Sequence, residues 1–454
     1  MAERRIFERL VAVGVGLILL IVGGMSFDRA ARGRFDFHHF FLDARYVWEH
    51  AGLNPNFDDP EPDRRRQLPF YLPVVPLALS PLTAFGRTAA AVVWSMAQVA
   101  ALGISLYILW RWCMRSNAAD PASSAWAVPV PAAPVAYARD RARLPAVGAF
   151  GATILLAVPA FLEAGKFNQL SYFVLALILG GVTAVECARP KTAGVLFGAA
   201  AVLKLLPAIF LVWLLLKRRW TAAITLVVVG LVLAFVPPLV VFGPQRTLEY
   251  HQQWWGYNVR GDSASGLLKA DLPDHFIDRR NQSIPQVLAR LTWSEHPFAA
   301  PIQPIQLEPQ TCTWLAYGIS GVLLAALMWA TRRSWSGLAP QRRHAEAAVY
   351  AISMLVFSPL LRQYYLVWAV PALALLARMA VDETAPRAQR LGQVGLGVWA
   401  LGMIVWIWPL ARVLGAHLFM LLVLGVLLLC ATRAVLSKQE EYGQVSARPS
   451  TALV

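Results

Sequence analysis

Two aspartates seven residues apart begin a short aromatic stretch that follows the first long apolar segment. Asp36 and Asp43 lie within residues 34–46, and on a continuous helix they would share one face. A carboxylate among aromatic side chains at a membrane surface can have a raised pKa and act as a general base towards a hydroxyl. Asp36 is therefore the candidate catalytic base, and Asp43 is a possible second carboxylate. The alternative role for Asp36 is structural, as an N-cap of the following amphipathic stretch.

Two histidines between these aspartates do not predict a metal site. His38 and His39 are adjacent in the sequence, so on a helix they point to different faces and do not form a ligand pair. We therefore predict no metal in this stretch.

Polar and charged side chains also occur near one end of several apolar segments. They are Glu163, Lys166, Asn168, Gln169, Lys204, Arg362, Gln363, Tyr364 and Tyr365. A charge inside an apolar segment costs about 2.5–3.5 kcal/mol on insertion scales, so such residues are functional candidates. Lys204 and Arg362 suit the phosphate of a lipid-linked substrate. The alternative for Lys204 is that its ammonium extends to the membrane surface.

Aromatic and amide side chains in a later segment are typical of sugar-binding surfaces. Residues 250–258 carry two tryptophans and two tyrosines among amides, and Asn281-Gln282-Ser283 follows. Aromatic rings stack on the C–H groups of a pyranose while amides bond its hydroxyls. The candidates for contact with a sugar or an acceptor are Asn168, Asn281, Gln282 and Tyr364. The same aromatic residues are equally typical of the belt at a membrane interface.

The elements that must position these residues are membrane-spanning helices. Of the 454 residues, 57% are hydrophobic and 15% are charged, whereas soluble domains carry about 25% charged residues. A chain this apolar cannot hide its surplus in a soluble core, so the composition excludes a soluble enzyme and a disordered regulator. The net charge is +15, but the basic residues form short clusters between apolar segments. This pattern indicates positive-inside topology and no nucleic-acid partner.

We predict an all-α polytopic membrane protein with about 12 spans and both termini inside. The clear apolar segments lie at about 10–28, 88–112, 145–162, 170–187, 221–242, 313–331, 392–410 and 414–433. Residues 192–216 and 345–378 are each too long for one upright span. Each is predicted to break and form a pair of spans, the first at residues 204–207 and the second at residues 358–363.

The membrane domain is predicted to cover residues 1–436. Two large outer loops, rich in acidic and aromatic residues, are expected at about 29–87 and 243–312. An Ala- and Pro-rich cytoplasmic linker is expected at about 116–143, and a disordered cytoplasmic tail at 437–454.

Taken in order along the chain, these motifs resemble glycosyltransferase family 87, polytopic enzymes of the GT-C class that include polyprenyl-phosphate-mannose-dependent mannosyltransferases. The resemblance covers about residues 10–380. The motifs that carry it are Asp36-Phe37 through Gly52-Leu53-Asn54-Pro55, Phe70-Tyr71-Leu72-Pro73, Ser80-Pro81-Leu82, Lys204-Leu205-Leu206-Pro207, Lys217-Arg218-Arg219-Trp220, Asn281-Gln282-Ser283, and Ser358-Pro359 with Tyr364-Tyr365. The implied fold is a GT-C-type transmembrane bundle.

The resemblance implies inverting transfer of a hexose, with mannose expected, from a polyprenyl phosphate to a hydroxyl of a lipid or glycan acceptor. The reaction would take place on the outer face of a bacterial inner membrane. Asp36 would be the general base, and Lys204 and Arg362 would stabilise the donor phosphate. Asn281 and Gln282 would bond sugar hydroxyls. The departing phosphate carries its own charge, so no metal or cofactor is expected; the chain has no glycine-rich phosphate loop and no Asp-x-Asp pair.

Other classes of protein fit the same composition. A polytopic transporter or lipid flippase would carry polar residues at mid-depth in pseudo-symmetric halves. Here the polar residues gather at the outer ends of the spans, and no internal repeat is found. A non-catalytic scaffold of envelope synthesis is not excluded by the sequence. Within the enzymes, other lipid-linked sugar transferases such as an arabinosyltransferase stay open.

Overall fold

The computed structural model describes residues 2–53, 71–114, 133–256 and 278–446, apart from 304, 334, 336, 337, 339 and 384. Within these ranges every regular element is a helix, in agreement with the predicted all-α class. The elements are α1 (Ala2–Ala31), α2 (Asp36–His50), α3 (Val74–Thr83), α4 (Gly86–Met114), α5 (Ala133–Phe167), α6 (Ser171–Glu186), α7 (Pro190–Leu203), η3 (Leu206–Ala208), α8 (Ile209–Leu216), α9 (Trp220–Trp255), α11 (Ile284–Thr292), α12 (Pro309–Ala330), α13 (Pro340–Val356), η7 (Gln363–Ala369), α14 (Val370–Ala380), α15 (Pro386–Val405), α16 (Pro409–Val413) and α17 (Ala416–Ser446).

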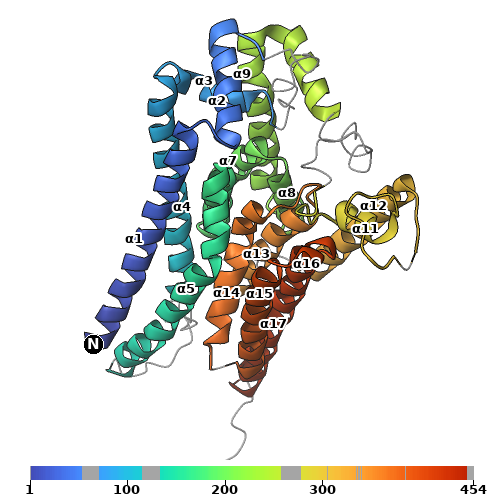
Figure 1. Cartoon of the computed structure of the whole chain (residues 1–454). Coiled ribbons are helices and arrows are strands. Elements are labelled where there is room, and N and C mark those ends of the chain that lie inside the picture. The colour runs from blue at the N-terminus through green and yellow to red at the C-terminus, as the bar shows by residue number, and fades with distance from the viewer. Residues whose placement is uncertain are drawn as a thin grey trace, which may run out of the picture.

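The long apolar helices form one elongated bundle. Within the described residues, five helices are long and apolar enough to cross a membrane, in α1, α4, α5, α9 and α12. The predicted number of about 12 spans is not confirmed by this criterion. Helices α1 and α4 lie side by side, and the short helices α2 and α3 lie at the end of the bundle opposite the N-terminus (Figure 1).

Both predicted breaks in the over-long apolar segments are confirmed. Helix α7 ends at Leu203, and Lys204 is extended at φ −156° and ψ 129° before the short helix η3 begins. Pro207 lies in η3, where its missing N–H and fixed φ oppose a continuous α-helix. In the second segment α13 ends at Val356, and η7 begins only at Gln363. Each break places polar side chains, Lys204 in the first and Arg362 in the second, between helices of the bundle.

The ranges predicted as loops and tail contain helices. Residues 29–87 include α2 and α3, and residues 243–312 include the end of α9 and α11. Helix α9 continues through a kink at Gly243, whose φ of 79° is left-handed. Helix α17 extends to Ser446. Residues 54–70, 115–132, 257–277 and 447–454, on which parts of the predicted loops, linker and tail fall, lie outside the described residues.

An amphipathic pattern holds α2 against the bundle. Its buried residues Phe37, Phe40, Phe41, Ala44 and Val47 recur at helical spacing and form one apolar face. The rings of Phe37 and Phe40 lie 5.8 and 5.6 Å from the indole of Trp94 in α4. Helix α2 therefore has a defined rotation, and this rotation determines where Asp36 and Asp43 lie.

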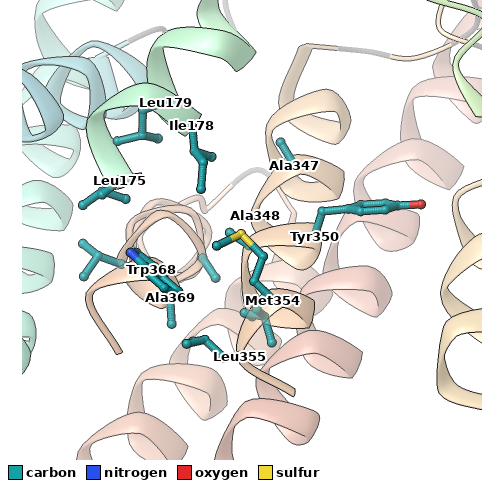
Figure 2. Packing of buried hydrophobic residues seen from close by; sticks show 14 of the residues in the cluster. Leu175, Ile178, Leu179, Ala347, Ala348, Tyr350, Met354, Leu355, Trp368 and Ala369 are labelled. Atoms are coloured by element: carbon teal, nitrogen blue, oxygen red, sulfur yellow. The ribbon is translucent and has the colours of Figure 1, made fainter. Parts of the chain in front are cut away.

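The largest part of the core surrounds η7. Figure 2 shows Leu175, Ile178 and Leu179 of α6 on one side of Trp368 and Ala369, with residues of α13 on the other. The Trp368 side chain is fully buried, and its Nε1–H donates to the Ser171 carbonyl over 3.0 Å. These contacts hold the end of η7 against the start of α6.

Two glycines allow α7 and α9 to approach closely. A Cβ added at Gly194 would lie 2.6 Å from the Ala222 carbonyl oxygen, and one added at Gly198 would lie 2.8 Å from the Leu226 carbonyl oxygen. Small residues at this spacing let the backbones of membrane helices pack directly against each other. Because α7 ends one residue before Lys204, this packing also positions the lysine.

We expect Gly194→Ala to destabilise the protein by about 1–3 kcal/mol, because the added methyl group overpacks against backbone atoms of α9. Gly103→Ala in α4 is the matched control, since a Cβ there meets nothing within 4 Å. Thermal unfolding of the purified protein measures both. Equal unfolding midpoints for the two variants would contradict the close α7–α9 contact.

Candidate active site

The first turn of α2 places the Asp36 carboxylate beside the corner between α5 and α6. The N-cap position of α2 is Phe35, which forms no side-chain cap, and Asp36 is the first helical residue. The Asp36 Oδ2 instead accepts a hydrogen bond from the Gln169 Nε2. Asp36 therefore contributes a contact across the bundle, and the N-cap role is not observed.

Asn168 holds the backbone of this corner. It has a φ of 55°, a left-handed conformation that asparagine tolerates better than most residues. Its side chain is fully buried, where its Nδ2 donates to the Ser26 carbonyl over 3.0 Å and its Oδ1 accepts from the Ser26 hydroxyl. These two bonds join the corner to α1 and direct the neighbouring Gln169 towards Asp36.

The break after α7 places the Lys204 ammonium among aromatic rings. Its Nζ lies 4.0, 5.6 and 5.8 Å from the ring centroids of Tyr365, Tyr71 and Trp368. It donates to the Tyr365 hydroxyl over 2.5 Å and to the Gln169 Oε1 over 3.4 Å. Aromatic faces and neutral oxygens thus surround the cation, an arrangement that stabilises a desolvated charge.

Gln169 connects the carboxylate to the ammonium. Its amide nitrogen donates to Asp36, and its amide oxygen accepts from Lys204 and, over 3.3 Å, from the Tyr71 hydroxyl. Only 3% of Gln169 is exposed, so the bridge is shielded from solvent. We call Asp36, Tyr71, Gln169, Lys204 and Tyr365 the bridged cluster.

Burial dominates the electrostatics of the carboxyl groups of α2. It raises the pKa of Asp36 to about 7, while the positive charge of Lys204 opposes this shift because it favours the carboxylate. Burial also raises the pKa of Asp43 to about 7. A base is most effective when its pKa lies close to the working pH. Both carboxyl groups therefore have the proton affinity that general-base chemistry at neutral pH requires.

Tyr364 and Arg362 lie on the segment that leads into η7. The Tyr364 ring packs against Phe167 at 5.0 Å and against Tyr365 at 4.4 Å, so it borders the bridged cluster. The guanidinium of Arg362 forms a 3.0 Å ion pair with Asp278, and only 12% of its side chain is exposed. A phosphate at Arg362 would share this cation with Asp278.

Asn281 and Gln282 bond to the backbone of two other segments. The Asn281 Oδ1 accepts from the Leu361 N–H over 3.0 Å, and the Gln282 Nε2 donates to the Arg412 carbonyl over 2.7 Å. Both residues are fully buried. The Asn281 side chain holds the polypeptide that precedes Arg362, and the Gln282 side chain holds α16. Their contact with sugar hydroxyls stays a prediction.

Three members of the bridged cluster had no role assigned from the sequence: Gln169 and Tyr365 were named only as polar candidates, and Tyr71 was not a candidate. Gln169 and Tyr365 directly follow the predicted candidates Asn168 and Tyr364, and Tyr71 lies in a motif that carries the family resemblance. The polar stretches were thus recognisable in the sequence. Which neighbour faces the cluster depends on the direction of each side chain at the corner, and sequence spacing does not reveal it.

The cluster combines a proton acceptor with a separate cation. Asp36 can take a proton from a hydroxyl, and Lys204 can stabilise negative charge on a nearby phosphate. Within the part of the chain that is described, no group of three or more His, Cys, Asp or Glu residues is placed to hold a metal ion. The chemistry that these side chains support is deprotonation of a hydroxyl next to an anionic leaving group.

Comparison with known proteins gives the same class of enzyme. The family model of glycosyltransferase family 87 matches residues 69–359. Two curated relatives are polyprenol-phosphate-mannose-dependent alpha-(1-2)-phosphatidylinositol mannoside mannosyltransferases. The protein from Mycolicibacterium smegmatis is 25% identical over 240 residues, which are 52% of this chain and 48% of the relative. The protein from Mycobacterium tuberculosis is 26% identical over 214 residues, 45% of this chain and 40% of the relative.

The matched region therefore spans less than half of each of these relatives. No solved structure matches the chain. The family match alone covers 291 of the 454 residues, counted from 69 to 359 inclusive, and it includes Tyr71, Gln169 and Lys204 of the bridged cluster. The chain belongs to glycosyltransferase family 87.

Proposed function

We propose that the protein transfers a hexose, with mannose as the expected sugar, from a polyprenyl phosphate to a hydroxyl group of a lipid or glycan acceptor. The observation that carries this proposal is the bridged cluster, in which one amide joins a carboxyl group of raised pKa to an ammonium that is surrounded by aromatic rings. The names of the two mannosyltransferase relatives support the choice of donor.

In the proposed reaction Asp36 removes the proton of the acceptor hydroxyl as its oxygen attacks the anomeric carbon. The new glycosidic bond forms as the bond from that carbon to the phosphate oxygen breaks, and attack from the opposite face inverts the anomeric centre. The polyprenyl phosphate leaves with the electron pair, and the proton stays on Asp36. Lys204 stabilises the charge that grows on the leaving phosphate.

The remaining site residues have supporting roles in this proposal. Gln169 holds the Asp36 carboxylate at a constant distance from Lys204, and Tyr71 and Tyr365 exclude water from both groups. Arg362 is the second cation for the donor phosphate, and Tyr364 is proposed to contact the sugar. Asn281 and Gln282 are proposed to contact sugar hydroxyls, which requires that these buried side chains become accessible to the sugar.

The site is proposed to face the outside of a bacterial inner membrane. The bridged cluster lies at the end of α1 away from the N-terminus, since Ser26 of α1 contacts Asn168. The basic residues Arg4, Arg5 and Arg9 at the other end of α1 favour the cytoplasm. We also propose that the chain crosses this membrane about 12 times.

We expect Asp36→Asn to lower kcat for sugar transfer by about 10²- to 10⁴-fold, because an amide cannot accept the hydroxyl proton. Asp43→Asn is the matched control, since Asp43 is on the same helix and its pKa is raised in the same way. Transfer of radiolabel from polyprenyl-phosphate-mannose to a membrane-lipid extract in proteoliposomes measures both. Wild-type turnover in Asp36→Asn with loss in Asp43→Asn would reassign the base to Asp43.

The pH dependence of kcat/KM provides a separate test of the base. The acidic limb of the profile, where activity rises with pH, is expected to have its midpoint near pH 7, because Asp36 must be deprotonated to accept a proton. Lys204 lowers the pKa of this carboxyl group, so Lys204→Met should move the midpoint to higher pH. A midpoint that stays in place in Lys204→Met would show that the ionising group is not coupled to the lysine.

Lys204→Met should also lower kcat by about 10²- to 10³-fold, the usual effect of removing one group that stabilises transition-state charge. The matched control is Lys166→Met, which removes a half-exposed ammonium that forms an ion pair with Glu163 near the same corner. Steady-state kinetics with varied donor concentration measure both variants. Equal kinetic constants for wild type and Lys204→Met would exclude a role at the leaving phosphate.

A further inference from the structure

A second group of cations lies at the other end of the bundle, near the N-terminal part of α1. Two arginines from distant parts of the chain approach one indole there. The guanidinium carbon of Arg219, at the start of α9, lies 4.8 Å from the Trp335 ring centroid, and that of Arg343 in α13 lies 4.5 Å from it. We call Arg219, Arg343 and Trp335 the arginine pair site.

Ring contacts place this site relative to α1. The Trp112 ring stacks on His344, the neighbour of Arg343, with 4.2 Å between centroids. Two residues earlier in α4, Trp110 packs against Phe150 of α5 at 5.1 Å. The next residue of α5, Gly151, lies beside Val11 of α1. The arginine pair site and the bridged cluster therefore lie at opposite ends of the bundle.

Of the carboxylates near the arginine pair site, Glu346 is neutralised by other cations, whereas Glu186 attracts Arg343 from a longer distance. Glu346 forms ion pairs with Lys217 at 2.6 Å and with Arg342 at 3.2 Å. Glu186 contacts His344. Among the side chains that the structure describes, no ion pair forms with Arg219 or Arg343. The residues of the adjoining loop outside the described set are serines 334 and 336, Gly337 and Ala339, which carry no charge.

Hydrogen bonding is also incomplete at these two arginines. The Nε–H groups of Arg219 and Arg343 are both buried, and neither has an acceptor within the described part of the chain. The Arg343 Nη2 donates over 3.3 Å to the Trp335 carbonyl. Two like charges near one ring repel each other, and a buried donor without an acceptor costs about 1–3 kcal/mol. An anion with several oxygens would remove both costs.

We infer that the arginine pair site binds a phosphate group, supplied by the headgroup of an anionic phospholipid in the leaflet on the N-terminal side. Guanidinium groups form bidentate hydrogen bonds with the oxygens of a phosphate. An indole beside them is typical of the depth at which lipid headgroups lie in a membrane. Trp220, which follows Arg219, is 58% exposed, and Trp329 of α12 is 60% exposed, as expected for side chains at a lipid interface. The site is separate from the proposed transfer reaction.

Titration of the full-length protein in detergent with dihexanoyl phosphatidylglycerol tests this inference. We expect a saturable rise in the thermal unfolding midpoint for the wild type. The double variant Arg219→Gln/Arg343→Gln should need at least tenfold more phosphatidylglycerol for the same rise. The matched control is Arg218→Gln, which removes an exposed arginine from the adjacent position of the same turn. It should respond like the wild type.

Two further titrations identify the source of the phosphate. Dihexanoyl phosphatidylcholine, whose choline neutralises its phosphate, should give no saturable rise. Saturation by inorganic phosphate at a lower concentration than phosphatidylglycerol would overturn the proposal that a lipid supplies the phosphate. The site would then bind free phosphate. Equal responses of the wild type and the double variant to phosphatidylglycerol would overturn the site itself. Should the double variant fail to fold, the single variants Arg219→Gln and Arg343→Gln are each expected to weaken binding, and wild-type affinity in both would overturn the site.

Discussion

The desolvated ammonium of Lys204 is the group on which the arrangement around it depends. Removing an ammonium from water is costly unless other groups replace its hydration shell. Here Tyr365, Gln169 and the faces of three aromatic rings take that role. These partners are neutral, so the positive charge is solvated without being cancelled. It therefore stays available to an anion that binds beside it.

Four elements from distant parts of the sequence must meet for this to happen. The break after α7 supplies the lysine, the α5–α6 corner supplies Gln169, and η7 supplies Tyr365. Helix α2 adds Asp36. The rotation of this helix is set by the packing of its apolar face against Trp94. Because each element is held by its own packing, the carboxylate and the ammonium are already placed on either side of one amide before a substrate binds. This preorganisation is what electrostatic catalysis requires.

Cations at the two ends of the bundle have different kinds of partner. Around Lys204 the cation is surrounded by neutral acceptors and is indirectly linked to Asp36 through one amide. Around Glu346 the cations Lys217 and Arg342 form direct ion pairs with it. The pair of Lys217 with Glu346 joins the end of α8 to α13, whereas the amide-mediated arrangement leaves both charged groups able to interact with a ligand. Arg219 and Arg343 belong to neither arrangement, which distinguishes them from the structural cations.

The sequence by itself determined the helical class, the two breaks and the polar stretches of the site. Long apolar segments can form only helices in a membrane, and Pro207 opposes a continuous helix wherever the segment lies. Family motifs singled out Asp36 and Lys204, which the structure brings to the same amide. Only the tertiary structure decided that Gln169 forms the bridge while Asn168 turns away to Ser26, because the left-handed backbone at Asn168 directs the two neighbours apart. It also decided that Arg362 pairs with Asp278 and that Asn281 holds the backbone at Leu361, because such contacts join residues about 80 positions apart, beyond the reach of local spacing.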